Sequence, residues 1–212
     1  MTINLIDPDI YMDIRQTKPT ILDFFKCLKV DYLPRTRIDW EPLLSMDLYE
    51  SPYYLQNNEE FDFLAYRYGD AIENAYIAPV YIKKINDRIG FGLFAAAEIP
   101  VSSFIGEYAG VVQISGKYTH CYHSEKGYES DYSWYYPDEP EGAPPLEING
   151  RFAGNEMRFA NHAEDPNLCV EHTLYDGQWV LFFTAGRDIQ KDEQLLISYG
   201  DAYWEEGYRI KG

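Results

Sequence analysis

The pattern of apolar and turn residues changes near residue 80, and this change constrains the fold more than any other feature. From Val80 to Tyr199, short apolar or alternating runs recur roughly every ten residues, separated by glycine, proline and polar turns. Because many short strands with little helix between them are typical of a compact β domain, we predict a mainly β fold for residues 80–212. The strand candidates are Val80–Lys83, Gly92–Ala96, Phe104–Tyr108, Tyr132–Tyr136, Trp179–Thr184 and Leu195–Tyr199.

The first 79 residues have a helical pattern instead. Apolar residues between Ile21 and Leu28 recur at helical spacing, and a second such face runs from Glu59 to Tyr76. Pro42 and Pro52 interrupt the stretch between them, which predicts short helices or loops there. We therefore predict an α-helical flank over residues 1–79. Its apolar faces need a partner, and the simplest one is the β domain itself. The other roles left open for the flank are to shape substrate access or to form a dimer surface.

The charge balance limits the kind of partner. The chain of 212 residues holds 18 Lys and Arg against 35 Asp and Glu, a net charge of −17. Such a field repels phosphate backbones, so we expect no direct nucleic-acid binding and favour a Lys/Arg-rich protein partner. The oligomeric state stays open.

Cysteine usage indicates a reducing compartment. The three cysteines are far apart and form no CxxC pair, so the sequence supports neither a disulfide framework nor a metal site. We expect Cys169 to be buried. The N-terminus lacks a Sec signal pattern, and no apolar run approaches the length of a membrane span. The expected location is intracellular, cytoplasmic or nuclear, with action in another cell after secretion by another route left open.

Three short motifs carry the chemistry. They are Gly90-Phe91-Gly92, Arg158-Phe159-Ala160-Asn161-His162 and Leu195-Leu196-Ile197-Ser198-Tyr199-Gly200-Asp201. Each motif alone is also typical of an ordinary turn or strand end. The order and spacing of the motifs along the chain are more informative than any one of them. Two further segments lie between them, namely Gly106-Glu107-Tyr108-Ala109-Gly110 and Pro166-Asn167.

In this order the motifs resemble the SET-domain family of protein-lysine methyltransferases, over about Val80 to Trp204. The resemblance implies a small β fold with a C-terminal pseudoknot, in which the Asn-His segment passes beneath a loop, a rare exception to unknotted topology. It also implies S-adenosylmethionine as cofactor, with the substrate lysine entering from the opposite face. The family's zinc-binding flanking modules are not expected, because the cysteine clusters that they need are missing.

The resemblance also implies roles for individual residues. Tyr199 and Tyr108 would be the catalytic residues at the methyl-transfer point. The cofactor would be bound by Ile89, Phe91, Gly92, Arg158, Phe159, Asn161, His162 and Trp204. The substrate would be bound by Tyr132, Trp134, Ile197 and Tyr203. Ile197 stands where the family often has Phe or Tyr, a position that influences how many methyl groups are added, so the methylation state is not predicted.

The physical chemistry agrees with these roles. A free lysine has a pKa near 10.4, so its neutral, nucleophilic form costs roughly 4–5 kcal/mol at pH 7. An aromatic channel disfavours the ammonium form by desolvation, partly offset by cation–π attraction. The segment from Glu129 to Glu147 is acidic and aromatic, which suits a Lys/Arg-rich peptide docked as an added strand.

The predicted function is therefore a protein-lysine N-methyltransferase acting on a histone, a histone-like protein or a ribosomal protein. One alternative is a catalytically silent SET-like module that binds basic peptides. Another is an acidic chaperone or decoy in which charge alone matters. Cofactor binding discriminates the enzyme from both alternatives.

Overall fold

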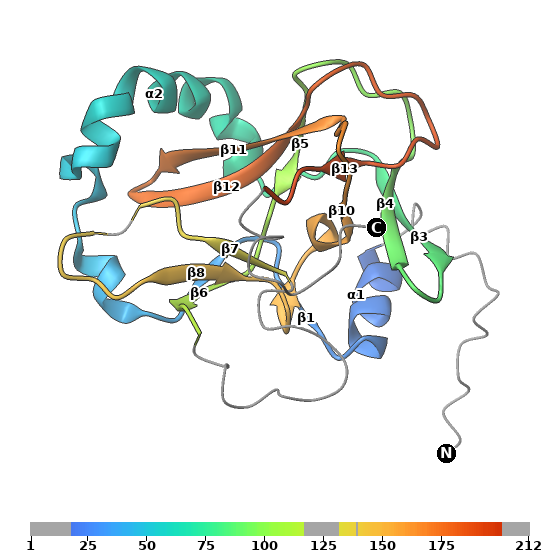
Figure 1. The fold of residues 1–212 in the computed structure, drawn as a ribbon, viewed down its shortest axis with the longest axis horizontal. Coiled ribbons are helices and arrows are strands. Elements are labelled where there is room, and N and C mark those ends of the chain that lie inside the picture. The colour runs from blue at the N-terminus through green and yellow to red at the C-terminus, as the bar shows by residue number, and fades with distance from the viewer. Residues whose placement is uncertain (1–17, 117–131, 139, 201–212) are drawn as a thin grey trace.

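The computed structural model describes residues 18–116, 132–138 and 140–200. Its helices are α1 (Lys18–Cys27) and α2 (Pro52–Glu73), with short 3-10 helices η1 (Glu41–Ser45), η2 (Leu48–Glu50) and η3 (Glu156–Phe159). Its strands are β1 (Asp31–Tyr32), β2 (Arg37–Ile38), β3 (Val80–Asn86), β4 (Gly90–Ala95), β5 (Phe104–Glu107), β6 (Val111–Ile114), β7 (Ser133–Tyr135), β8 (Leu146–Asn149), β9 (Ala153–Gly154), β10 (Asn161–His162), β11 (Leu168–Tyr175), β12 (Gln178–Ala185) and β13 (Leu196–Ile197). The predicted mainly β architecture with an α flank is confirmed (Figure 1).

The strands of the described residues form several small sheets. One sheet has the order β2-β6-β8-β7, a second has the order β11-β12-β5, and β3 pairs with β4 as a hairpin. Two further pairs are parallel and join distant segments, namely β1 with β9 and β10 with β13. In Figure 1, α2 lies over one face of the β11–β12 ribbon, with the β6–β8–β7 sheet on the other side. Because both faces are covered, β12 is buried along almost its whole length.

The N-terminal flank is built onto the β domain. The helix predicted around Ile21–Leu28 is confirmed as α1. The second helix begins at Pro52, earlier than predicted, because the Ser51 hydroxyl caps it by accepting from the Tyr54 N–H at 3.1 Å. The strands β1 and β2 were not predicted, and they pair with β9 and β6 of the β domain. The domain boundary near residue 79 stays a prediction, but strands from both sides of it pair in the same sheets.

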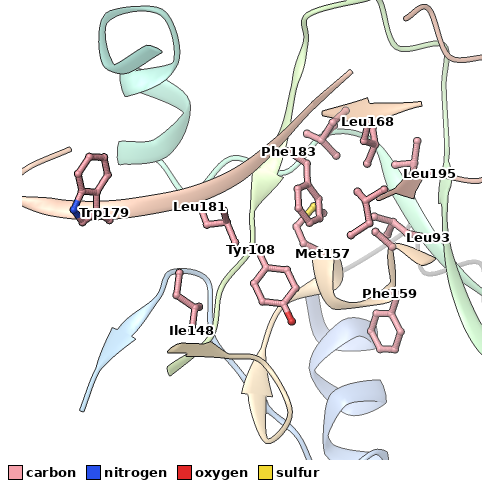
Figure 2. Close-up of a cluster of buried hydrophobic side chains, with 14 of the residues drawn as sticks. Leu93, Tyr108, Ile148, Met157, Phe159, Leu168, Trp179, Leu181, Phe183 and Leu195 are labelled. Carbon is pink, nitrogen blue, oxygen red and sulfur yellow. The ribbon is translucent and has the colours of Figure 1, made fainter. Parts of the chain in front are cut away.

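The main hydrophobic core lies beside the candidate site residues. Figure 2 shows Leu93, Met157 and Phe183 packed together next to the ring of Tyr108. Leu181 and Trp179 extend the core along β12 toward α2. The site is therefore supported by rigid, buried elements rather than by free loops.

Two observations bear on the cysteine and membrane expectations. The prediction that Cys169 is buried was wrong, because its side chain is exposed on β11 with no disulfide. Alternate residues of this antiparallel strand face opposite ways, and Leu168, the residue before Cys169, is the buried one.

Within the described ranges, no helix has the length and apolar character needed to span a membrane.

Candidate active site

The parallel pair of β10 and β13 brings together two of the three motifs. Asn161 lies opposite Leu196 and His162 opposite Ile197, and the Ala163 N–H donates to the Ile197 carbonyl at 3.0 Å. The N–H of Tyr199 donates to Nδ1 of His162 at 3.2 Å. The Asn-His segment therefore lies directly beside the last strand, as the expected pseudoknot requires.

The Gly90-Phe91-Gly92 motif on β4 also contacts the Asn-His segment. The Asn161 side-chain amide donates to the Phe91 carbonyl at 3.1 Å. A Cβ added at Gly92 would lie 2.7 Å from the Ile85 side chain and 3.2 Å from the Asn161 amide nitrogen. Gly92 therefore lets β4 pack closely against Asn161, and a side chain there would displace the ends of neighbouring side chains. Gly90 has a φ of +81° at the hairpin turn, a conformation that favours glycine.

The two predicted catalytic tyrosines lie near each other. Tyr108 is 3% exposed, and its hydroxyl donates to the Tyr132 carbonyl at 2.7 Å. Tyr199 is partly buried, and its hydroxyl donates to the Ala160 carbonyl at 3.3 Å. Burial, followed by the nearby Tyr199 and Tyr132, raises the pKa of Tyr108 well above its usual value, although Arg158 opposes the shift. Tyr108 therefore stays a neutral phenol near pH 7.

Tyr132 and Trp134 line the Tyr108 side of the site. The Trp134 ring meets the Tyr108 ring edge-on at a centroid distance of 6.0 Å. Tyr132 has a φ of +68°, an uncommon conformation for a residue with a side chain. Its carbonyl accepts both the Tyr108 hydroxyl and the Gly150 N–H, and this pair of hydrogen bonds holds the strained residue in place.

Arg158 connects the turn at Gly150 and Arg151 with the ring of Tyr132. Its guanidinium donates to the carbonyls of Gly150 at 3.0 Å and Arg151 at 3.2 Å. The guanidinium carbon also lies 4.2 Å from the centroid of the Tyr132 ring. Burial lowers the pKa of Arg158 from its usual value. The observed contacts are thus with the turn at Gly150 and with Tyr132, while the expected role toward the cofactor stays a prediction.

Gly150 was not predicted as a site residue, although it lies against the hydroxyl of Tyr108. A Cβ added there would lie 2.7 Å from the Tyr108 hydroxyl oxygen. The Asn149-Gly150 dipeptide is a turn signal that could have predicted a bend after a strand. Nothing local in the sequence indicates that this bend borders Tyr108, which is 42 positions earlier.

The remaining predicted residues are distributed unevenly. Phe91 and Phe159 lie with their ring centroids 6.2 Å apart, and Ile197 is buried beside His162. Ile89 is 53% exposed at the tip of the β3–β4 hairpin, where its N–H donates to the Asn86 side chain at 2.8 Å. Tyr203 and Trp204 lie outside the described residues. Among the described residues, no three His, Cys, Asp or Glu side chains gather as metal ligands.

One part of the acidic surface expectation was wrong. Glu147, counted among the acidic residues facing a basic peptide, is 9% exposed. Its carboxylate accepts hydrogen bonds from Gln113 at 2.7 Å, Ser133 at 2.7 Å and Asn149 at 3.1 Å. The carboxylate therefore fastens β8 to β6 and β7 internally, and a docked peptide would meet it only by breaking these bonds.

Comparison with known proteins extends the likeness beyond these motifs. The SET domain family model matches residues 90–200. Mouse histone-lysine N-methyltransferase EHMT1 is 29% identical over 138 residues, which cover 63% of this chain and 10% of that protein. Histone-lysine N-methyltransferase, H3 lysine-9 specific SUVH5 of Arabidopsis thaliana is 36% identical over 129 residues, which cover 58% of this chain and 15% of that protein. The chain thus spans only a small fraction of the length of these curated relatives.

Solved structures give the same result for the fold. The crystal structure of the Chaetomium thermophilum polycomb repressive complex 2 matches with a TM-score of 0.55 and 26% identity, over 66% of this chain and 17% of that chain. The same complex in an autoinhibited conformation bound to S-adenosylmethionine matches with a TM-score of 0.52 and 25% identity, over 68% of this chain and 19% of that chain. The SET fold predicted from the sequence is confirmed. Since the family model covers more than half of its residues, the chain belongs to the SET-domain family.

Proposed function

We propose that the chain is an S-adenosylmethionine-dependent protein-lysine N-methyltransferase that acts on a basic protein. The observation that carries this proposal is the convergence of Tyr108 and Tyr199 beside the paired Asn161–His162 and Leu196–Ile197 segments. Support comes from the relatives, which are histone-lysine methyltransferases. A histone, a histone-like protein or a ribosomal protein is the substrate class that we propose.

The donor set fits the cofactor. The Asn161 amide nitrogen donates to the Phe91 carbonyl, which fixes the side chain with its Oδ1 as the acceptor end. That oxygen can accept from an amino group, and the Phe91 and Phe159 rings offer apolar contact beside it. When bound, S-adenosylmethionine supplies an electrophilic methyl group on a sulfonium. We propose that Asn161, His162 and the main chain of Phe91 and Gly92 hold it.

The two tyrosines are suited to orienting an amine. Each phenol proton is donated to a main-chain carbonyl, Tyr132 for Tyr108 and Ala160 for Tyr199. A phenol oxygen that donates its proton to a carbonyl can still accept a hydrogen bond through its own lone pairs. A neutral lysine amine that donates its N–H groups to these oxygens turns its own lone pair away from them and toward the transferable methyl. We propose Tyr199 as the main orienting group, with Tyr108 assisting.

Aromatic and aliphatic side chains define the surroundings of that amine. The Trp134 ring and the burial of Tyr108, which is 3% exposed, indicate a poorly hydrated environment, in which a lysine ammonium loses more solvation than the neutral amine. Ile197 adds an aliphatic surface without a hydroxyl. The chemistry needs no acyl intermediate, so positioning and desolvation are the contributions required from the protein.

The test is transfer of labelled methyl from S-adenosylmethionine to a panel of intact basic proteins. We expect label in a substrate band, and we expect Tyr199→Phe to lower turnover by roughly 100-fold or more while cofactor binding is retained. Tyr66→Phe is the matched control, because Tyr66 is 89% exposed on α2, and its activity should equal that of the wild type.

The outcomes separate the alternatives. Full turnover by a folded, cofactor-binding Tyr199→Phe protein contradicts the orienting role of Tyr199. Failure of the wild type to bind S-adenosylmethionine by calorimetry, together with no label in any protein, contradicts the enzyme and favours a module that binds basic peptides.

A further inference from the structure

The N-terminal helix α1 contacts the two aromatic residues of the proposed cofactor site. Phe24 is 4% exposed, and its ring centroid lies 5.1 Å from that of Phe91 and 5.8 Å from that of Phe159. Phe25, one residue later, is fully buried and lies 5.9 Å from Phe159. Figure 2 shows the Phe159 ring beside the α1 ribbon. The ring of Phe24 therefore fills the corner between β4 and η3.

The two rings that Phe24 contacts belong to segments whose main chains make the site. The Phe91 carbonyl accepts the Asn161 amide at 3.1 Å. Phe159 directly precedes Ala160, whose carbonyl accepts the Tyr199 hydroxyl at 3.3 Å. A change in the spacing of β4 and η3 thus moves both hydrogen bonds at once. In a close-packed interior, neighbouring groups relax only partly when a ring is removed.

The rest of the flank prevents α1 from shifting freely. The strand β1, which follows α1, pairs with β9, and the Asp31 N–H donates to the Phe152 carbonyl at 2.8 Å. The Tyr32 hydroxyl donates to the Glu156 carboxylate at 3.2 Å, at the start of η3. The Phe25 ring meets the Tyr32 ring edge-on at 5.2 Å. The helix is thereby fixed relative to η3 at both its side chains and its C-terminal end.

We infer that α1 is a positioning element for cofactor binding, with Phe24 as its positioning residue. Phe24 sets the distance between the main chain of β4 and the η3–β10 segment, and so places the Phe91 carbonyl and Asn161 for the cofactor. The inference rests on the proposed function, since it concerns the same site. It assigns residues outside the matched SET region a role in cofactor affinity.

The experiment compares two buried phenylalanines by calorimetry with S-adenosylmethionine. Phe24→Leu keeps an apolar side chain but removes the ring contacts with Phe91 and Phe159. Phe61→Leu is the matched control, because Phe61, on α2, is also 4% exposed and packs against Tyr53 and Trp179, away from the site. Both variants should lose similar thermal stability. We expect Phe24→Leu to raise the Kd for S-adenosylmethionine about tenfold or more, and Phe61→Leu to leave it within about twofold.

Calorimetry needs no methyl transfer, so the result does not depend on finding the protein substrate. Equal Kd values for the two variants, at equal losses of Tm, overturn the inference and leave Phe24 a purely structural residue. A wild type that binds no S-adenosylmethionine contradicts the proposed function instead, and is recognised before either variant is measured.

Discussion

Gly150 determines where the hydroxyl of Tyr108 can lie. An added Cβ at Gly150 would approach the Tyr108 oxygen to 2.7 Å, closer than real Cβ atoms come to a neighbour. The same turn holds Tyr132 through the Gly150 N–H and Arg158 through the Gly150 carbonyl. We therefore predict that Gly150→Ala displaces the Tyr108 hydroxyl and lowers kcat by roughly 10- to 100-fold, because small misplacements at a reacting group are costly.

The measurement is single-turnover methyl transfer at saturating cofactor, with Gly186→Ala as the control. A Cβ at Gly186 would meet the sulfur of the exposed Cys169 at 3.2 Å, which a flexible side chain can accommodate. Unchanged kcat in a folded Gly150→Ala protein would show that the position of Tyr108 does not limit the reaction.

Residue-level prediction from sequence succeeded where a short motif carries the contact. Asn161, His162 and Tyr199 lie in motifs, and the structure brings their segments together as predicted. Gly150 and Phe24 carry no such signal. A single glycine after Asn is typical of any turn, and an apolar residue on a helix face indicates only that the face is buried.

At the scale of elements, the side chain of Asn167 adds to the pairing with β10 in holding the short strand β13 in place. Asn167 is 1% exposed, and its amide nitrogen donates to the Gln194 carbonyl at 2.8 Å and to Glu193 at 3.0 Å. Its oxygen accepts the Leu196 N–H at 2.8 Å. Removing it deprives the partly buried Gln194 carbonyl and Leu196 N–H of their partner, and a polar group left unpaired costs about 1–3 kcal/mol when it is fully buried. We predict that Asn167→Ala lowers the free energy of unfolding by about 1–3 kcal/mol in total.

Chemical denaturation measures this loss, and calorimetry with S-adenosylmethionine measures its consequence for the site. Asn74→Ala is the control, since Asn74 makes a similar bond to the Asp70 carbonyl at 2.7 Å on the exposed end of α2. It should cost about 0.5 kcal/mol or less. Equal losses from the two substitutions would mean that β13 is held by its neighbours rather than by Asn167.

The sequence did not predict strands that pair with a segment far away in the chain, or a strand that itself carries polar residues. Each of β1 and β2 has two residues, too few for an alternating pattern, and each depends on parallel pairing with a strand more than 70 positions away. The strand β8 was missed because Glu147 and Asn149 resemble loop residues. The Glu147 carboxylate can be buried because Gln113 and Ser133 donate hydrogen bonds to it, and Asn149 in turn donates to Glu147; the local sequence does not reveal these partners.

At the scale of the whole molecule, the flank and the β domain form one folded unit. The strands β1 and β2 complete sheets of the β domain, and the Thr36 N–H donates to the buried carboxylate of Glu107 at 2.7 Å. Composition and motif order predicted the β domain and its class. The attachment of the flank depends on long-range contacts, so only its helical character could be predicted.

The charge of the molecule leads to a prediction about its substrate. A net charge of −17, with 20 acidic against 9 basic residues over 88–212, creates a negative field around the candidate site. The exposed Tyr135 on the edge strand β7 and the exposed Glu141 beyond it are surfaces that a Lys/Arg-rich peptide can contact. The burial of Glu147 removes one charge from that surface, so the peptide is attracted by the overall field more than by a row of paired carboxylates.

The dependence of KM on salt concentration therefore distinguishes attraction of the peptide by this field from recognition through local contacts. The Debye length falls from about 10 Å at 0.1 M salt to about 3 Å at 1 M, which screens the field while leaving buried contacts intact. We predict that KM for a basic peptide rises about tenfold or more over this range, with little change in kcat. Calorimetry with S-adenosylmethionine at the same salt concentrations is the control, and its Kd should change much less because the cofactor carries little net charge. If KM is independent of salt while the enzyme stays active, recognition depends on contacts at β7 and at the proposed lysine site, and the acidity of the chain serves another purpose.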